Sequence, residues 1–390
     1  MQLLQGIRVL ESANFITGPY AGMLLADLGA EVIKIEKPNE GDPFRHFQGK
    51  LYSPHFQAYN RNKKSMTLDV RTEEGKQALY NLVSTADIFI ENFRPGVTQK
   101  LGISHEHLRP LNPRLIYCSI TGFGPDGPYK HRPSYDTVGQ ALSGAFSLYL
   151  DKENPRIPGG TFSDGLTGLY ACYGILGALF ERERTGVGRK VETNMLESSM
   201  AFVAEPFVNY FMTNQVSGPY RRTMISQSFA FVCQDELAFI IHLSLPEKFW
   251  QSLLKAVERE ELNRDPRFDA REKRVKNYWE LQDELTRIFR TKPRAYWLQR
   301  LEEYDVPFAP VYGLDEVIKD PQVQHLGSIY VASHPTEGQV KGVKRPVFYD
   351  GARDDSVIPP PTLGEHTDEI LKEIKYPEEK IQSLRDAGII

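Results

Sequence analysis

The sequence contains only three cysteines among its 390 residues, Cys118, Cys172 and Cys233. No C-x-x-C pair occurs and their number is odd, which argues against both a disulfide framework and a cysteine-based zinc site. The nine histidines form no H-x-x-x-H pair, and no serine nucleophile lies beside a histidine in a recognised pattern. The sequence therefore predicts neither a metal site nor a serine triad.

Neither sign of charge predominates, and no apolar run is long. The 47 basic and 51 acidic residues give a net charge of −4, too balanced for a protein that binds nucleic acid or a membrane surface electrostatically. The longest apolar stretch, residues 169–180, is too short to span a bilayer. The start of the sequence does not resemble a signal peptide. We therefore expect a cytoplasmic protein, or an organelle-matrix protein whose targeting segment is absent from this sequence.

The first half of the chain alternates predicted strands with predicted helices. Strands are expected at residues 7–11, 31–36, 66–70, 86–91 and 115–121, and helices at 18–28, 73–85, 165–184 and 191–211. This alternation favours an α/β fold with a parallel, doubly wound sheet.

The character of the sequence changes near residue 225, as expected for a chain long enough for about two domains. A hairpin turning near Asp235 and amphipathic helices at 246–258, 278–289 and 293–304 predict a smaller α+β domain over residues 225–325. We therefore expect a large domain over residues 1–224. A C-terminal segment, 326–390, is expected to return to it with short strands and a helix at 366–373.

Asp164 is the most informative acidic residue, because it lies where a Gly-Gly loop meets the long apolar helix. One interpretation is an N-cap, whose carboxylate accepts hydrogen bonds from the first free backbone N–H groups of the helix. The other is a carboxylate nucleophile, since a helix N-terminus stabilises an anion and neighbouring glycines let a substrate approach. The local sequence does not separate these two interpretations.

Three further segments each have a structural and a functional interpretation. The turn GPYAG, residues 18–22, fits neither G-x-G-x-x-G nor a P-loop, so a tight turn with close helix packing is favoured over a nucleotide site. The loop at 122–128 is either a plain Gly/Pro turn or a ligand-binding loop after a strand. The basic cluster at 60–65 is either a solvated turn or a phosphate site.

Taken together, these segments resemble the class III CoA-transferases, the formyl-CoA:oxalate and carnitine CoA-transferase type, a family that also contains α-methylacyl-CoA racemases. The blocks that carry the resemblance are GIRVLE, GPYAGMLLADLGAEVIKIEKPNEGD, NRNKKSMTLDV, ADIFIENFRPG, LIYCSITGFGPDGP, SYDTVGQALSG, FSDGLTG and LGEHTDEIL. They occur in order over nearly the whole chain.

The resemblance implies a Rossmann-like large domain and an interlocked homodimer, with Asp164 as the catalytic aspartate. The family's CoA contacts correspond to Ile16, Thr17, Lys37, Leu68, Asp69, Val70, Arg71, Asn92, Phe93, Lys100, Arg132 and Tyr135. Lys37 and Lys100 stand where a close relative has arginine, which keeps the charge but loses the bidentate geometry.

The activity implied is transfer of CoA from an acyl-CoA to a free carboxylic acid, through an aspartyl mixed anhydride and an aspartyl-CoA thioester. CoA thioester is then a cosubstrate, and no prosthetic group is required. Two alternatives are a 2-methylacyl-CoA racemase and a non-catalytic CoA-binding protein. Tyr135 argues against the racemase, because racemases have a histidine base there and a tyrosine of ordinary pKa near 10 is a poor base.

The acids are harder to assign. Formyl-CoA transferases have a glycine-rich loop in the small domain, whereas residues 242–247 contain no glycine run, which disfavours formyl transfer to oxalate. The blocks NRNKKS, LIYCSITG and HPTEG resemble relatives that act on dicarboxylates. Arg61, Arg132 and Arg222 are candidates for a second carboxylate, with a surface role as the alternative.

Overall fold

The chain divides into two units in this computed structural model, which describes residues 2–48, 51–244, 246–353 and 356–390. The first unit comprises Met1–Phe146, Arg156–Val208 and Gly327–Ile390, and the second comprises Ser147–Pro155 and Asn209–Leu326. The domain boundaries expected from the sequence remain predictions. Within the described ranges, no helix has the length and apolar character needed to cross a membrane.

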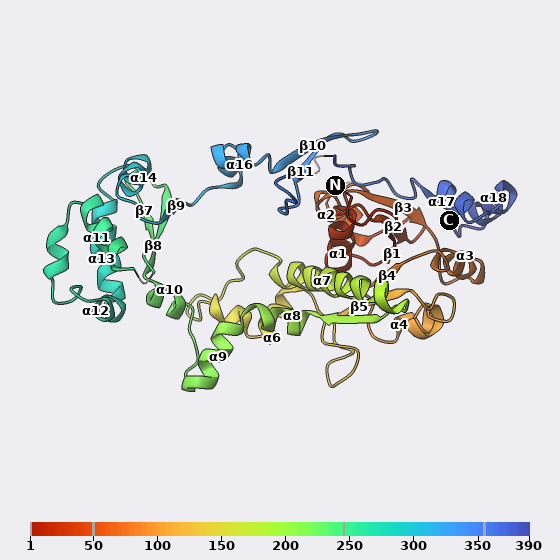
Figure 1. The fold of residues 1–390 in the computed structure, drawn as a ribbon, viewed down its shortest axis with the longest axis horizontal. Helices are drawn as coiled ribbons and strands as arrows, with labels where there is room; N and C mark the ends of the chain where they lie inside the picture. The colour runs from red at the N-terminus through yellow and green to blue at the C-terminus, as the bar shows by residue number, and fades with distance from the viewer. Residues whose placement is uncertain (1, 49–50, 245, 354–355) are drawn as a thin grey trace. The chain divides into compact units, whose positions relative to one another are not determined.

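A six-stranded sheet forms the centre of the first unit (Figure 1). Its strands are β1 (Arg8–Ser12), β2 (Glu31–Glu36), β3 (Lys63–Thr67), β4 (Ile88–Glu91), β5 (Ile116–Thr121) and β6 (Lys190–Asn194). Every neighbouring pair is parallel, in the order β3-β2-β1-β4-β5-β6. The predicted α/β fold with a parallel sheet is therefore confirmed. From β1 the chain adds β2 and β3 on one side of the sheet and then β4, β5 and β6 on the other. Because the strand order switches between β1 and β4, ligands are expected at the carboxyl ends of these two strands.

Both faces of the sheet are covered, so the central strands are apolar on both sides. Helices α1 (Thr17–Ala26) and α7 (Phe162–Thr185) cover one face, with Leu25 and Ile175 in their shared core. Helices α3 (Glu73–Val83), α17 (Thr367–Glu373) and α18 (Glu378–Asp386) cover the other. The remaining elements assigned to this unit are η1 (Pro43–His46), α2 (Pro54–Tyr59), α4 (Val97–Leu101), α5 (His105–Leu108), α6 (Asp136–Leu142), α8 (Met195–Phe202) and the antiparallel pair β10 (Ile329–His334) and β11 (Gly338–Val343).

The helix predicted over 191–211 is wrong at its start. Residues 190–194 form β6 at the edge of the sheet, and helix α8 begins only at Met195. The β-branched Val191 and Thr193 favour a strand, and Asn194 then caps α8 by accepting a hydrogen bond from the backbone N–H of Glu197 at 2.8 Å. The alternation of polar and apolar residues in KVETN is too short to distinguish an edge strand from a helix.

The second unit has its own core. Strands β7 (Ser228–Val232), β8 (Ala238–His242) and β9 (Phe308–Pro310) form an antiparallel sheet, which confirms the hairpin predicted near Asp235. Phe231 packs with Phe289 of α13 (Tyr278–Phe289) in this core. The other elements, including two that cross a unit boundary, are η2 (Ala145–Leu148), α9 (Ala204–Thr213), α10 (Arg221–Ser226), α11 (Glu247–Ala256), η3 (Glu260–Arg264), α12 (Arg271–Lys276), α14 (Arg294–Glu303), α15 (Leu314–Val317) and α16 (Pro321–His325). Leu245, within the 242–247 region, lies outside the described residues.

Candidate active site

A cavity of about 370 Å³ opens at the carboxyl ends of β1, β4 and β5, entirely within the first unit. The turn after β1, the loop after β4 and the loop after β5 line it, together with residues of the 130–135 segment. Asp164 and Met195 complete the wall. The cavity therefore occupies the position at which a sheet of this strand order binds its ligands.

Asp164 lies in the first turn of α7, but it is not the residue that caps this helix. The helix begins at Phe162 with Thr161 as its N-cap, so Asp164 is the third helical residue and the predicted N-cap role is wrong. Two residues before it, Phe162 extends the helix beyond the start that the apolar pattern indicated. The side chain of Asp164 is thereby left to face the cavity that it lines.

The carboxyl group of Asp164 is held in an environment that disfavours its charge. Burial, and next the nearby carboxylate of Asp136, raise the pKa of Asp164 to about 7. Asp136 itself is fixed, because its Oδ1 accepts the backbone N–H of Asp164 at 3.1 Å and its Oδ2 accepts Nε2 of Gln140 at 2.5 Å. Near neutral pH, Asp164 is thus present in both the protonated and the ionised form.

The turn between β1 and α1 reaches the cavity because glycines allow close packing. A Cβ atom at Gly168 of α7 would lie 2.7 Å from the backbone oxygen of Thr17, and one at Gly18 would lie 2.3 Å from Cβ of Ala13. Real Cβ atoms do not approach this closely. GPYAG lies within α1 rather than in a tight turn, so only the close packing predicted for this segment is confirmed. This packing brings the turn before α1 against the helix that carries Asp164.

Asn92, at the end of β4, holds the same turn. Its Oδ1 accepts the backbone N–H of Asn14 at 3.0 Å, while its Nδ2 donates to the backbone oxygen of Asn14 at 2.7 Å and to Oγ1 of Thr17 at 3.0 Å. All of these bonds join the carboxyl ends of adjacent strands. The amide of Asn92 is therefore engaged in shaping the cavity wall.

Three cationic side chains line the cavity: Arg94, Lys130 and Arg132. The guanidinium of Arg132 lies 3.8 Å from the ring centroid of Tyr129. None of the three forms an ion pair with a carboxylate of the described chain. Together with Asp164, they give a site that combines a carboxyl group with a positive rim suited to an anionic substrate. No cluster of metal-ligating side chains occurs among the described residues.

The family model described as "CoA-transferase family III" matches residues 4–367. The chain belongs to CoA-transferase family III. The succinyl-CoA:glutarate CoA-transferase of Mus musculus is 33% identical, with 100% of this chain and 91% of the relative covered. The succinyl-CoA–D-citramalate CoA-transferase of Chloroflexus aurantiacus is 34% identical over 95% of this chain and 94% of the relative. A CAIB/BAIF family protein from Brucella suis superposes with a TM-score of 0.85 at 33% identity, covering 95% and 99% of the two chains.

This class III CoA-transferase uses CoA thioesters as cosubstrates, and the cavity contains part of the contact set predicted for CoA. The predicted residues that line it with Asp164 are Ile16, Thr17, Asn92, Phe93, Arg132 and Tyr135. Sequence reasoning did not identify Arg94 or Lys130. Arg94 follows directly on the Asn92–Phe93 pair in the ENFRPG block, so the motif itself was a usable signal, whereas Lys130 lies in a segment without a pattern.

The other predicted CoA contacts of the transferase lie outside the cavity wall: Lys37, Leu68, Asp69, Val70, Arg71 and Lys100. Most of them follow the carboxyl ends of β2 and β3. There Nζ of Lys37 lies 2.5 Å from Oε1 of Glu40, and Nη2 of Arg71 lies 2.6 Å from Oδ2 of Asp69. The side chain of Leu68 is buried in the core, which leaves only its backbone for a ligand. Their role in CoA binding remains a prediction.

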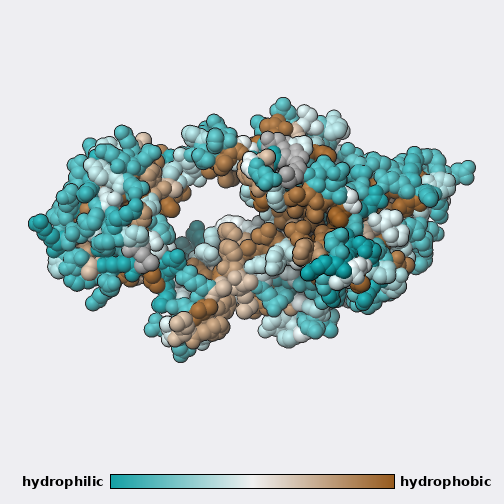
Figure 2. Space-filling view, in the orientation of Figure 1, coloured by the Kyte–Doolittle hydropathy of each residue, from teal (hydrophilic) through white to brown (hydrophobic). Residues whose placement is uncertain are grey.

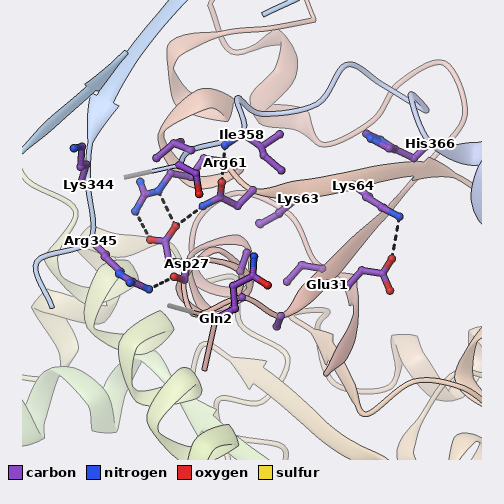
Figure 3. A pocket seen from close by; sticks show the side chains of 17 residues that line it. Gln2, Asp27, Glu31, Arg61, Lys63, Lys64, Lys344, Arg345, Ile358 and His366 are labelled. Carbon is purple, nitrogen blue, oxygen red and sulfur yellow. Dashed lines mark hydrogen bonds and ion pairs between the residues drawn. The ribbon is translucent and has the colours of Figure 1, made fainter. Parts of the chain in front are cut away.

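In the basic cluster at 60–65, Arg61 and Lys63 are buried in ion pairs rather than exposed in a solvated turn. Arg61 is buried and forms a bidentate pair with Asp27, with its Nε 2.9 Å from Oδ1 and its Nη2 2.5 Å from Oδ2 (Figure 3). Lys63 is buried with its Nζ 2.8 Å from Oε2 of Glu11. These cations are thus neutralised inside the transferase, at the start of β3 and away from the carboxyl ends that carry Asp164. Arg61 is therefore not placed to bind a second substrate carboxylate.

Proposed function

We propose that this enzyme transfers CoA from an acyl-CoA to a free carboxylic acid by covalent catalysis at Asp164. The observation that carries the proposal is the place of Asp164, which lines the cavity. Among the described residues, burial and the Asp136 carboxylate perturb its pKa, and no donor stabilises its charged form. A carboxylate without such stabilisation is a stronger nucleophile than one paired with a cation. The membership of family III supports acyl-CoA and acid as the two substrates.

The ionised carboxylate of Asp164 attacks the thioester carbonyl carbon, and CoA leaves as a thiolate. The thiolate then attacks the aspartyl carbonyl of the mixed anhydride, which releases the first acid and forms an aspartyl-CoA thioester. The second acid attacks this thioester, again expelling the thiolate and forming a new anhydride. Attack of the thiolate on the acyl carbon of that acid gives the product thioester and restores Asp164. Each attack develops an oxyanion that backbone N–H groups of the glycine loops can stabilise.

The positive rim supports a dicarboxylate as one of the substrate pair. One cation can face the phosphates of CoA, while a second carboxylate of the acid requires another. Arg94, Lys130 and Arg132 provide three around one cavity. The relatives from mouse and Chloroflexus carry succinyl-CoA in their names. We therefore propose a succinyl-type acyl donor.

Mass spectrometry in D₂O tests the proposal directly. The purified enzyme receives succinyl-CoA, acetyl-CoA or a 2-methylacyl-CoA with a panel of ¹³C-labelled carboxylic acids. A new thioester that carries the label and no α-deuterium is expected, and it identifies the acid pair. Deuterium at the α-carbon without label exchange would instead establish a racemase, and tight CoA binding without either change would establish a non-catalytic protein.

We further propose that two copies assemble into the interlocked homodimer implied by the family resemblance. Helix α7 exposes apolar side chains that a lone chain leaves in water, with Tyr173 74% and Phe180 70% exposed. Phe202 of α8 is 59% exposed. The space-filling view shows hydrophobic surface on the face where α7 lies (Figure 2). Exposed apolar surface of this kind is typical of a protein interface.

A further inference from the structure

Four charged side chains form a buried cluster beneath the turn between β1 and α1. Nζ of Lys34 lies 3.1 Å from Oε1 of Glu11 and 2.9 Å from Oδ2 of Asp42, and Nζ of Lys63 lies 2.8 Å from Oε2 of Glu11. All four side chains are 0% exposed. Burial alone would lower the pKa of Lys34, but the carboxylates of Asp42 and Glu11 outweigh it and raise that pKa. Lys34 is therefore a charged donor inside the protein.

Three side chains of this cluster also bond the backbone of the turn or of the start of α1. Lys34 donates to the backbone oxygen of Ala13 at 2.7 Å, and Asp42 accepts the backbone N–H of Phe15 at 3.2 Å. Lys63 donates at 2.7 Å to the backbone oxygen of Pro19, in the first turn of α1. The turn needs such support because Phe15 has a φ of +64°, a left-handed conformation that costs a non-glycine residue energy.

Gly22 of α1 makes room for the Glu11 carboxylate of this cluster. A Cβ atom at Gly22 would lie 1.9 Å from Oε2 of Glu11, so only glycine lets this carboxylate sit between α1 and the sheet. Stability does not account for such an arrangement, because apolar side chains of similar volume are often as good as a buried ion pair or better. Apolar side chains could not, however, bond two backbone groups of the turn and one at the start of α1.

We propose that Lys34 is a positioning residue for acyl-CoA, acting through the backbone of the turn that carries Ile16 and Thr17. This inference rests on the proposed function, since it requires the turn to contact the cosubstrate. The bond from Lys34 to Ala13 fixes the start of the turn, and Asn92 fixes its middle from the neighbouring strand. Without Lys34 the turn relaxes from its left-handed conformation, and the cavity wall next to Asp164 loses its shape.

The experiment uses double variants that remove the bond and keep the net charge of the cluster at zero. Lys34→Met/Asp42→Asn keeps the cluster neutral, and Oδ1 of the new asparagine still accepts the N–H of Phe15. Glu11→Gln/Lys34→Met is a second neutral pair that loses the same bond. The matched control is Arg61→Met/Asp27→Asn, because this buried pair has side chains only 8% and 5% exposed and does not bond the turn. Melting temperature, the Kd of CoA, and kcat and KM for acyl-CoA are measured for each full-length enzyme.

Both Lys34 pairs are expected to raise the Kd of CoA and the KM for acyl-CoA roughly tenfold or more, since small misplacements at a site have effects of this order. The control pair is expected to leave both constants within about twofold at a similar melting temperature. The single variant Asp42→Asn keeps the Lys34 bond and is expected to bind CoA as the unaltered enzyme does. If either Lys34 pair folds and binds CoA normally, or Asp42→Asn alone reproduces the loss, the positioning role is overturned. Absence of CoA binding or transfer by the unaltered enzyme would instead reject the proposed function itself.

Discussion

The backbone N–H of Asp164 donates to Oδ1 of Asp136 at 3.1 Å, so the first turns of α7 and α6 meet through a carboxylate beside the proposed nucleophile. This contact fixes Asp136 at the site and places its negative charge near the side chain of Asp164. The charge of Asp136 disfavours ionisation of the Asp164 carboxyl group and raises its pKa. The same repulsion makes the ionised form more reactive, as like charges do in active sites.

Replacing Asp136 by asparagine tests this electrostatic role. The amide oxygen of the substituted side chain can still accept the N–H of Asp164 but carries no charge, so the pKa of Asp164, about 7 in the unaltered protein, is expected to fall. Because the ionised carboxylate is the proposed nucleophile, the acidic limb of the pH profile of kcat/KM is expected to move to lower pH. Asp126→Asn, in the exposed loop at 122–128, is the control and leaves the limb in place. An unchanged limb in Asp136→Asn would show that Asp136 does not influence the reacting group.

Asp164→Asn is expected to reduce CoA transfer by roughly 10³-fold or more, since the loss of a covalent nucleophile has effects of this order. The amide has nearly the shape of the carboxylate but cannot form the anhydride. Steady-state rates with the acid pair found by mass spectrometry measure the loss, and CoA binding measured by calorimetry shows that the cavity is intact. Transfer at an undiminished rate would reject Asp164 as the nucleophile.

The same variant is expected to be more stable than the unaltered enzyme at high pH. The pKa of Asp164 rises from 3.8 to about 7 on folding, so between these values the folded state binds more protons than the unfolded state. Stability contributed at this position therefore decreases as pH increases through that window. The asparagine of the variant does not titrate, and its advantage should be absent below about pH 4, grow through the window and level off above about pH 7. The melting temperatures of both proteins, compared below about pH 4 and above about pH 7, measure this stability difference. A difference independent of pH would contradict the raised pKa of Asp164.

Most strands of the sheet were predictable because they are short apolar or alternating segments bounded by turns. The strand predicted at 66–70 lies instead at Lys63–Thr67, because its polar first residues pair with β2. Glu31–Glu36 has the same bounds in the sequence prediction and in the structure. Lys190–Asn194 was instead predicted as part of a helix. This edge strand buries few side chains, so its sequence lacks the apolar pattern of a central strand. Asp164 lines the cavity, and its catalytic role stays a prediction. Its helix begins at Phe162, three residues before the start predicted at residue 165, so the N-cap position expected for Asp164 was wrong.

The burial of the basic cluster at 60–65 in ion pairs could not be predicted from the local sequence. Arg61 and Lys63 are neutralised by Asp27 and Glu11, which are distant in sequence and meet them only when the sheet forms. Composition identifies a charged run but not its partners, and most such runs are solvated. Lys34 lies within the alternation of EVIKIE, and this pattern gives no sign that its side chain pairs with Glu11 and Asp42.

Disrupting the exposed face of α7 is expected to dissociate the proposed homodimer. Tyr173→Glu and Phe180→Glu introduce charges at side chains that are 74% and 70% exposed in one chain, so neither should harm the folding of that chain, whereas a charge buried in an interface is costly. Analytical ultracentrifugation measures the mass. Leu111→Glu, on the loop before β5, controls for a general effect of added charge. Dimers that persist in both α7 variants would place the interface elsewhere.

Arg61 and Arg132 are expected to affect different properties of the enzyme. Arg61→Met breaks a buried bidentate pair and leaves Asp27 as an unpaired buried charge, which costs about 3–5 kcal/mol of stability. KM for acyl-CoA should remain nearly unchanged in the folded fraction, because Arg61 does not line the cavity. Arg132→Ala removes an exposed cation from the cavity rim, so KM for the anionic substrates should rise about tenfold while stability changes by less than about 1 kcal/mol. Urea denaturation and substrate titration of both variants separate the two effects. A rise in KM confined to Arg61→Met would show instead that the basic cluster takes part in substrate binding.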